Sequence, residues 1–178
     1  MEDVSRIVVT GMGLVTPLGC GLHGPWKSLI NGQSGISKIS GIDVSDLPSQ
    51  IAGQVPRKGT GPFSEEFFDP DDYISSKDQK RMDVFIQYGL VAAILAISDS
   101  GWEPKDEESL LKTGVMVGSG IGGLPEIEKS AQIVNGGNVR RLSPFFIPAS
   151  LINLVSGQIA IRYGFKGPNS AVVTACAS

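Results

Sequence analysis

The C-terminal stretch 169–178, which reads N-S-A-V-V-T-A-C-A-S, contains the residue with the clearest capacity for chemistry, Cys176. Small residues flank this thiol, so a substrate carbon could reach the sulfur without steric obstruction. A thiolate in such a setting is a nucleophile that can form a covalent intermediate. The alternative is a structural cysteine, because free cysteine is among the most buried residue types. Cys176 is therefore a candidate catalytic nucleophile, with the structural alternative still open.

A catalytic cysteine needs a base or a positive electrostatic field to form its thiolate. The chain has one histidine, His23, which lies near the beginning of the sequence between Gly21 and Gly24. A lone histidine in a loop of this kind is usually just solvated. A Cys–His pair would therefore require either His23 or residues beyond Ser178, and a catalytic Cys176 would imply an incomplete chain.

The stretch 118–123 matches the pattern G-x-G-x-x-G, which binds dinucleotides when it follows a strand and precedes a helix. The acidic residue expected about twenty positions later is missing. Arg140 and Arg141 stand there instead. We therefore favour a glycine turn that lets backbone or an acyl chain approach closely, and keep dinucleotide binding as the alternative.

Three cations, Lys77, Lys80 and Arg81, gather at the start of the most regular helical pattern in the chain. Cations at a helix N-terminus oppose the macrodipole, at a few tenths of a kcal/mol each, so helix stability does not explain them. A docking surface for an acidic partner would explain them. The alternative is a solvated face that Asp78 and Asp83 balance in part.

The elements that position these residues follow from hydrophobic periodicity and from turn signals. Strands are expected at 6–10, 51–55, 113–117 and 170–174, and helices at 25–30, 125–134 and 148–163. A further helix follows a capping box at 76–79, carries apolar residues in three- and four-residue steps to Ile97, and ends at Gly101. This order predicts an α/β domain with parallel strands and helices on both faces of the sheet.

The composition is that of an ordinary globular domain, with 178 residues, 41% hydrophobic and 19% charged. A net charge of -3 argues against nucleic acid as the main partner. The 2 cysteines form no disulfide framework, which favours a reducing compartment. The longest strongly apolar run, 90–97, is too short to span a bilayer. We therefore predict a cytoplasmic protein with neither a membrane span nor a nucleic-acid partner.

Several stretches of the sequence, in the same order, resemble motifs of one family. They are V-V-T-G-M-G-L-V-T-P-L-G (8–19), S-S-K-D-Q-K-R-M-D-V-F-I-Q-Y-G (75–89), G-V-M-V-G-S-G-I-G-G (114–123), S-P-F-F-I-P (143–148) and Y-G-F-K-G-P-N-S-A-V-V-T-A-C-A-S (163–178). In these motifs the chain resembles the elongating β-ketoacyl-acyl-carrier-protein synthases, type II most of all. The resemblance covers the N-terminal half of such an enzyme and ends just after the nucleophile.

For the fold, the resemblance implies a thiolase-like α/β architecture, layered αβαβα in the whole enzyme. Residues 1–178 would form the N-terminal ketoacyl-synthase half, with a mixed, mostly parallel sheet. The C-terminal half would be absent from this chain. The resemblance also implies a homodimer.

For the chemistry, the resemblance implies that Cys176 takes an acyl group from acyl carrier protein as a thioester. Malonyl-acyl carrier protein would then lose CO2, and its carbanion would attack that thioester in a decarboxylative Claisen condensation. The product would be 3-oxoacyl-acyl carrier protein. The backbone amide of Cys176 would contribute to the oxyanion hole.

The resemblance also assigns roles to residues outside the C-terminal stretch. Ile121 and Phe146 would line the acyl pocket, with Phe146 reaching in from the second subunit. The cations at 77, 80 and 81 would dock acyl carrier protein, which reverses the preference for a solvated face. Neither a metal nor a cofactor is implied, since phosphopantetheine arrives on the carrier protein.

Other interpretations stay open beside the condensing enzyme. One is an inactive fragment or a carrier-protein-binding module. Another is a polyketide-type ketosynthase, although Val173 stands where modular polyketide synthases usually have an acidic residue. A nucleotide-dependent oxidoreductase is the third. Because the catalytic histidines of the family would lie downstream, we expect the isolated 178-residue chain to be inactive in condensation.

Overall fold

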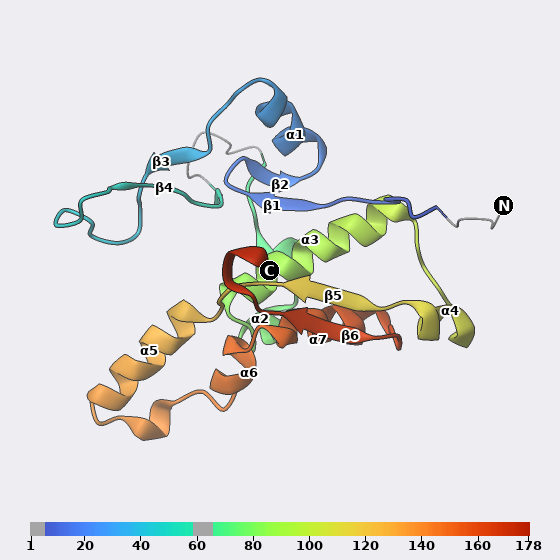
Figure 1. Ribbon diagram of the computed structural model, residues 1–178. Helices are drawn as coiled ribbons and strands as arrows, with labels where there is room; N and C mark the ends of the chain where they lie inside the picture. Colours follow the sequence, from blue (N-terminus) through green and yellow to red (C-terminus); the bar gives the residue numbers. More distant parts are fainter. Residues whose placement is uncertain (1–5, 59–65) are drawn as a thin grey trace. The chain divides into compact units, whose positions relative to one another are not determined.

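The computed structural model describes residues 6–58 and 66–178 (Figure 1). Its contacts divide the chain into two compact units. The first unit comprises Met1–Asp69 with Ala92–Glu103, and the second comprises Pro70–Val91 with Pro104–Ser178. The longest helix, α3 (Val84–Ser100), contributes its first half to the second unit and its second half to the first.

Besides the second half of α3, the regular structure in the described part of the first unit consists of two short hairpins and one helix. Its elements are β1 (Leu14–Thr16), β2 (Gly19–Gly21), α1 (His23–Ile30), β3 (Ile36–Lys38) and β4 (Ile51–Gly53). The pairs β1–β2 and β3–β4 are both antiparallel. In the first hairpin the Thr16 hydroxyl accepts from the Leu18 amide at 3.2 Å and donates to the Gly19 carbonyl at 3.3 Å. The T-P-L-G motif is thus the turn of this hairpin.

The predicted strand at 6–10 is wrong, because this segment pairs with no strand among the described residues and its apolar side chains are exposed. The segment instead leads to Gly11 and Gly13, which lie against the second half of α3. A Cβ added at either glycine would lie 2.3 Å from a helix carbonyl oxygen, of Ala96 or Ala92. The Met12 amide also donates to Asp99 at 2.9 Å. The G-M-G motif is therefore a close contact between backbone and helix.

The second unit contains most of the helices and the parallel strand pair. After the first half of α3, its main elements are α2 (Ser76–Gln79), α4 (Glu107–Lys112), β5 (Val115–Gly118), α5 (Leu124–Asn135), α6 (Phe146–Ser150), α7 (Asn153–Tyr163) and β6 (Asn169–Val172). Single 3₁₀ turns occur at η1 (Pro70–Asp72), η2 (Val139–Arg141) and η3 (Ala175–Ala177).

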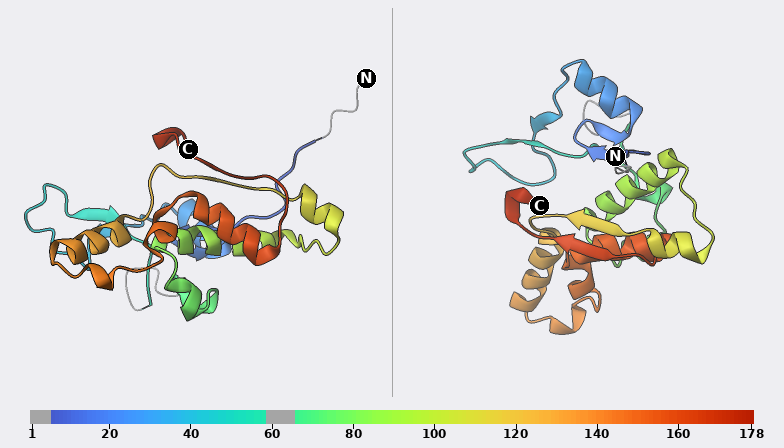
Figure 2. Two further views of the ribbon diagram at one scale, coloured as in Figure 1. Left: turned by 90° about the horizontal axis from the view of Figure 1, so that it is seen from below. Right: turned by 45° about the vertical axis from the view of Figure 1, so that its right-hand side comes forward.

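The strands β5 and β6 are parallel, and their register runs from Val115 opposite Asn169 to Gly118 opposite Val172. Helix α7 packs against both strands, as Figures 1 and 2 show. Val115 and Val117 are half-buried, whereas the intervening Met116 is 75% exposed. One face of the pair is thus covered within the unit. The three sheets of the described chain are each two-stranded, and only this one is parallel, so the expected mostly parallel sheet is shown only in part.

Helices α3 and α7 supply much of the buried core of this unit. Ile86 and Leu90 of α3, with Val155 and Ile159 of α7, are all at most 5% exposed. The two helices approach closely at Gly89, where an added Cβ would lie 2.5 Å from a methyl carbon of Val155. The apolar periodicity that predicted both helices therefore marks their buried faces.

Several helix boundaries differ from the sequence-based expectation. The single helix expected from 76–79 to Ile97 is divided into α2 and α3. Helix α1 begins at His23, so this histidine does not lie in a loop. The capping serine is Ser75 rather than Ser76, and its hydroxyl accepts from the Asp78 amide at 3.2 Å. The expected helix at 148–163 is divided into α6 and α7, because Leu151 has an extended backbone with ψ 129°. The ends of α3 and α7 agree with expectation, since Gly101 and Gly164 are both left-handed.

Candidate active site

Cys176 lies in the η3 turn that directly follows β6. The preceding residue, Ala175, has φ 52° and is the one non-glycine residue with positive φ in the described parts of the chain. A left-handed backbone costs an alanine about 1–2 kcal/mol. Around it, the Ser178 hydroxyl accepts from the Thr174 amide at 2.7 Å, and the Ala177 amide donates to the Thr174 carbonyl at 3.1 Å. Strain of this kind is often concentrated at functional sites.

The thiol and the backbone amide of Cys176 are both accessible for chemistry. The residue is a free, exposed cysteine in this chain, an exposure that does not fit the alternative of a buried structural cysteine. Within residues 6–58 and 66–178, the Cys176 amide donates no hydrogen bond. An amide without an acceptor at the nucleophile can donate to a developing oxyanion.

The stretch 118–123 lies directly beside the cysteine turn. A Cβ added at Gly118 would lie 2.7 Å from the backbone carbon of Ser178, and one at Gly120 would lie 3.2 Å from the Ala175 carbonyl oxygen. The Ser119 amide donates to the Val172 carbonyl at 3.1 Å and so extends the contact of β5 with β6. These glycines are needed because two backbone segments approach closely, as the sequence predicted.

An open, largely apolar cavity of about 370 Å³ adjoins this turn. Its lining residues are Gly120, Ile121, Gly122, Ser150, Leu151, Ile152, Asn153, Ala171 and Val173. The volume is within the range of small-molecule sites. Gly120 connects the cavity to the cysteine turn through its contact with Ala175.

The two residues assigned to the acyl pocket are placed differently. Ile121 lines the cavity and is 65% exposed. Phe146 is the first residue of α6, is half-buried, and does not line this cavity. The sequence reading missed Leu151, Ile152 and Val173 as cavity residues. Leu151 and Ile152 lie at the break between α6 and α7, where they line the cavity. No local sequence pattern predicted that break.

The predicted docking cations all lie on or directly after the short helix α2. Lys77 and Lys80 are exposed, and neither forms an ion pair within the described chain. Arg81 differs, because its guanidinium lies 4.0 Å from Asp78 and 4.9 Å from the ring centre of Phe145. The two lysines are therefore the more available cations.

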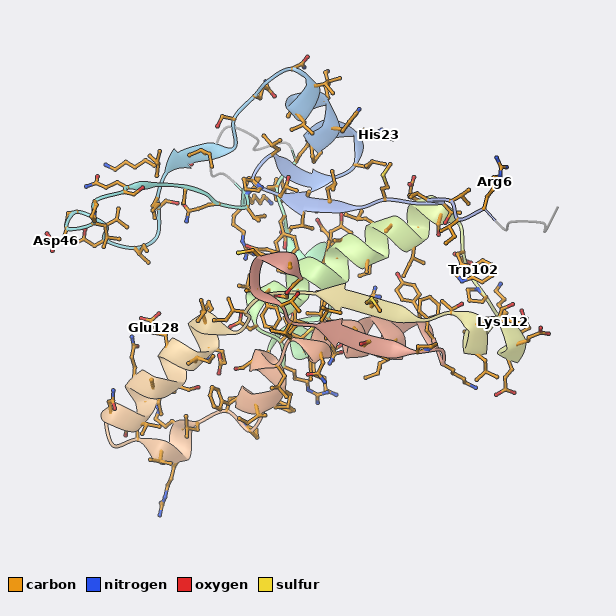
Figure 3. All side chains as sticks on the ribbon, viewed as in Figure 1. Arg6, His23, Asp46, Trp102, Lys112 and Glu128 are labelled. Atoms are coloured by element: carbon orange, nitrogen blue, oxygen red, sulfur yellow. The ribbon has the colours of Figure 1, made fainter. Side chains whose placement is uncertain are left out.

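The remaining sequence candidates belong to other elements of the chain. His23 is the exposed first residue of α1 in the first unit (Figure 3). Arg140 and Arg141 belong to η2 and are exposed. Across the described residues there is no cluster of three or more histidine, cysteine, aspartate or glutamate side chains arranged to hold a metal. Nor does any helix among them have the length and apolarity needed to cross a membrane.

Comparisons with known proteins agree with this geometry. Residues 4–178 match the family model of the β-ketoacyl synthase N-terminal domain. The chain is 44% identical over 97% of its length to a 3-oxoacyl-[acyl-carrier-protein] synthase 2 of Rhizobium meliloti, covering 40% of that protein. It is likewise 44% identical to the synthase of the same name from Vibrio cholerae, over 96% of this chain and 39% of the relative. The chain thus spans about two fifths of the length of these relatives.

Solved structures show the same fold. A ketosynthase/chain length factor of ishigamide matches 94% of this chain and 39% of its own, with a TM-score of 0.73 and 22% identity. A type II polyketide ketosynthase in complex with its acyl-carrier protein matches 93% of this chain and 40% of its own, with a TM-score of 0.66 and 22% identity. These neighbours establish a thiolase-like α/β fold. The family match over residues 4–178 shows that the chain belongs to the β-ketoacyl synthase family, as its N-terminal domain.

Proposed function

We propose that this chain provides the nucleophile of a condensing enzyme of type II fatty-acid synthesis, a 3-oxoacyl-acyl-carrier-protein synthase. The observation that carries the proposal is the exposed thiol of Cys176 on a strained turn, adjoining an apolar cavity of about 370 Å³. The names of the relatives from Rhizobium meliloti and Vibrio cholerae support the same reaction.

In the first half of the proposed reaction, the Cys176 thiolate attacks the carbonyl carbon of an acyl thioester on acyl carrier protein. The oxyanion that forms is stabilised by the unpaired Cys176 amide. The new S–C bond to Cys176 forms as the bond to the carrier sulfur breaks, and the departing carrier thiolate takes up the proton that Cys176 gave up on forming its thiolate. The apolar side chain of Ile121 then contacts the acyl chain in the cavity.

In the second half, malonyl-acyl carrier protein loses CO2, and the electron pair of the broken C–C bond becomes a carbanion. This carbon attacks the acyl-Cys176 thioester, and the S–C bond breaks to release the cysteine thiolate. The product is 3-oxoacyl-acyl carrier protein, longer by two carbons. Phosphopantetheine enters on the carrier protein, and we propose that the reaction needs no further cofactor.

Acyl loading of Cys176 can be tested by intact-protein mass spectrometry after incubation with acyl-acyl carrier protein. The intact protein, as the cell makes it, is expected to gain one acyl group. Cys176→Ala is expected to abolish this gain. Cys20→Ala is the matched control, since it removes the other cysteine and leaves the site unchanged. Loading that persists in Cys176→Ala would refute the nucleophile assignment.

We also propose that Lys77 and Lys80 form the docking surface for acyl carrier protein. Support comes from their exposure and lack of ion pairs in the described chain, and from the carrier-protein complex of a structural neighbour. Arg81 contributes to this surface from its position over Phe145. Charged rims of this kind mainly govern association rate and salt dependence.

The docking proposal predicts that Lys77→Glu with Lys80→Glu weakens carrier-protein binding by about tenfold or more, because like charges then face each other. The measurement is the Kd of acyl carrier protein at low and high salt. Lys105→Glu is the control for a single charge reversal, since Lys105 is an exposed lysine outside this surface. An unchanged Kd in the double variant would show that docking occurs elsewhere.

A homodimer in which Phe146 reaches the partner's acyl pocket is a further part of the proposal. It is supported by exposed apolar residues on α5 and α6, among them Ile127 at 42% and Ile147 at 59%. Apolar patches of this type mark interfaces more often than free surface.

A mostly parallel sheet layered αβαβα and a cytoplasmic location are likewise proposed for the whole protein.

A further inference from the structure

Asp83 is a buried carboxylate that links two elements far apart in the sequence. The residue is 7% exposed and immediately precedes α3. Its Oδ2 accepts from the backbone amide of Glu126 at 2.9 Å, across a separation of 43 residues. Its Oδ1 accepts from the amide of Phe85 at 3.4 Å. From the sequence alone, Asp83 is expected only to balance the charge of its cationic neighbours.

Helix α5 has an N-terminus that cannot cap itself. Its N-cap is Gly123, which has φ 72° and forms no side-chain capping bond. The second residue of the helix, Pro125, has no amide hydrogen to donate. The Glu126 amide is thus one of the few donors left in the first turn, and only a group from outside can satisfy it. Asp83 provides that acceptor, and its negative charge also favours the positive end of this 12-residue helix.

This bond fixes one end of the turn that contains Ile121. At the other end, Gly118 and Gly120 are packed against the backbone of the cysteine turn. Between the two, the ring of Phe85 lies so close to Gly122 that an added Cβ would be 2.6 Å from it. Asp83 and Phe85 thus both contact the chain between Gly122 and Glu126, and Gly122 lines the cavity.

We propose that Asp83 is a positioning residue, which fixes the turn bearing Ile121 and so limits the length of acyl chain that the cavity accepts. The inference rests on the proposed function, since an acyl chain is the proposed occupant of the cavity. Asp83 itself is not among the residues that line the cavity. Its influence passes through the Glu126 amide to the start of α5.

The test compares acyl loading of Cys176 with C8, C12 and C16 thioesters in the intact protein. Asp83→Ala is expected to raise the loading rate of C16 relative to C8 by about fivefold or more, because a single added methylene can be worth about tenfold in a fitted apolar pocket. Asp83→Asn keeps one acceptor oxygen and is expected to restore most of the wild-type ratio. Amide hydrogen exchange should become faster at residues 121–127 in Asp83→Ala.

Asp106→Ala is the matched control, because Asp106 is also a capping carboxylate and accepts from the Ser109 amide at 2.8 Å, at the start of α4. It is expected to leave the length ratio unchanged. A wild-type ratio in Asp83→Ala, or the same change in Asp106→Ala, would overturn the inference. If the wild-type protein accepts no acyl group at all, the proposed function fails instead. In that case, amide hydrogen exchange at residues 121–127 tests the positioning role of Asp83 by itself. Unchanged exchange in Asp83→Ala would refute that role.

Discussion

Two buried serine hydroxyls of the second unit differ in whether they have a hydrogen-bond partner. Ser130 of α5 is 4% exposed, and its hydroxyl has no hydrogen-bond partner among the residues that the structure describes. Ser156 of α7 is fully buried, and its hydroxyl donates to the Asn153 carbonyl at 2.9 Å. A buried hydroxyl without a partner costs about 1–3 kcal/mol. The two serines therefore have the same chemistry with opposite energetic consequences.

Ser130→Ala is expected to leave the free energy of unfolding unchanged or to raise it by about 1 kcal/mol, because it removes an unsatisfied polar group. Ser156→Ala is expected to lower it by about 1 kcal/mol, because it removes a satisfied hydrogen bond. Urea denaturation followed by circular dichroism measures both. A larger loss in Ser130→Ala than in Ser156→Ala would mean that the Ser130 hydroxyl has a partner in solution.

At the scale of elements, two glycines within helices allow the effect of packing on stability to be distinguished from the effect of helix propensity. Gly89 of α3 lies against Val155 of α7, whereas the nearest atom to a Cβ added at Gly157 is a methyl carbon of Leu154 at 3.9 Å. Alanine is favoured over glycine in a helix interior by about 1 kcal/mol. Only the second position has room for that gain.

Gly157→Ala is therefore expected to stabilise the protein by about 0.5–1 kcal/mol. Gly89→Ala is expected to destabilise it by about 1–3 kcal/mol, because the added methyl overpacks the contact of α3 with α7. Both changes in the free energy of unfolding can be measured from the midpoint and slope of urea denaturation. Equal stabilisation by the two substitutions would show that α3 and α7 are separated further in solution.

A salt bridge between Glu107 and Lys166 joins helix α4 to the segment before β6. This contact is sensitive to acid, because it needs an ionised carboxylate. Lys166 donates to Glu107 at 2.9 Å, and this hydrogen bond, with the attraction of its charge, lowers the pKa of Glu107 below its ordinary 4.5. The backbone amide of Ser109 likewise lowers the pKa of Asp106 below its ordinary 3.8. Groups with a lowered folded-state pKa contribute stability above their unfolded pKa, and this stability is lost as the pH falls through the folded value.

We therefore expect the stability supplied by these two carboxylates to be complete at neutral pH and to decline below about pH 4.5. Glu107→Gln with Asp106→Asn should reduce the difference between the unfolding midpoints at pH 7 and pH 3. Glu108→Gln is the control, because the salt bridge of Glu108 with Lys112 lies within α4 and does not join this helix to the segment before β6. An unchanged pH dependence in the double variant would contradict the assignment.

At the scale of the whole chain, the sequence predicted the features that depend on local pattern. Helix α3 and the helix ends marked by Gly101 and Gly164 follow from apolar periodicity and from glycine turn signals. The segment 6–10 has a strand-like composition, but a strand exists only where a second strand pairs with it, and composition cannot supply that. The bond from Asp83 to Glu126 spans 43 residues, so no local pattern contains it.

The last prediction concerns the isolated chain of 178 residues, which spans about two fifths of its relatives. We expect it to make no 3-oxoacyl product, because the resemblance assigns the decarboxylation step to two histidines and this chain has only His23. The measurement is mass-spectrometric detection of 3-oxoacyl-acyl carrier protein after incubation with acyl and malonyl donors. The synthase of Vibrio cholerae, run in parallel, shows that the donors are competent. Product above the level of Cys176→Ala would mean that residues 1–178 contain a second means of stabilising the carbanion.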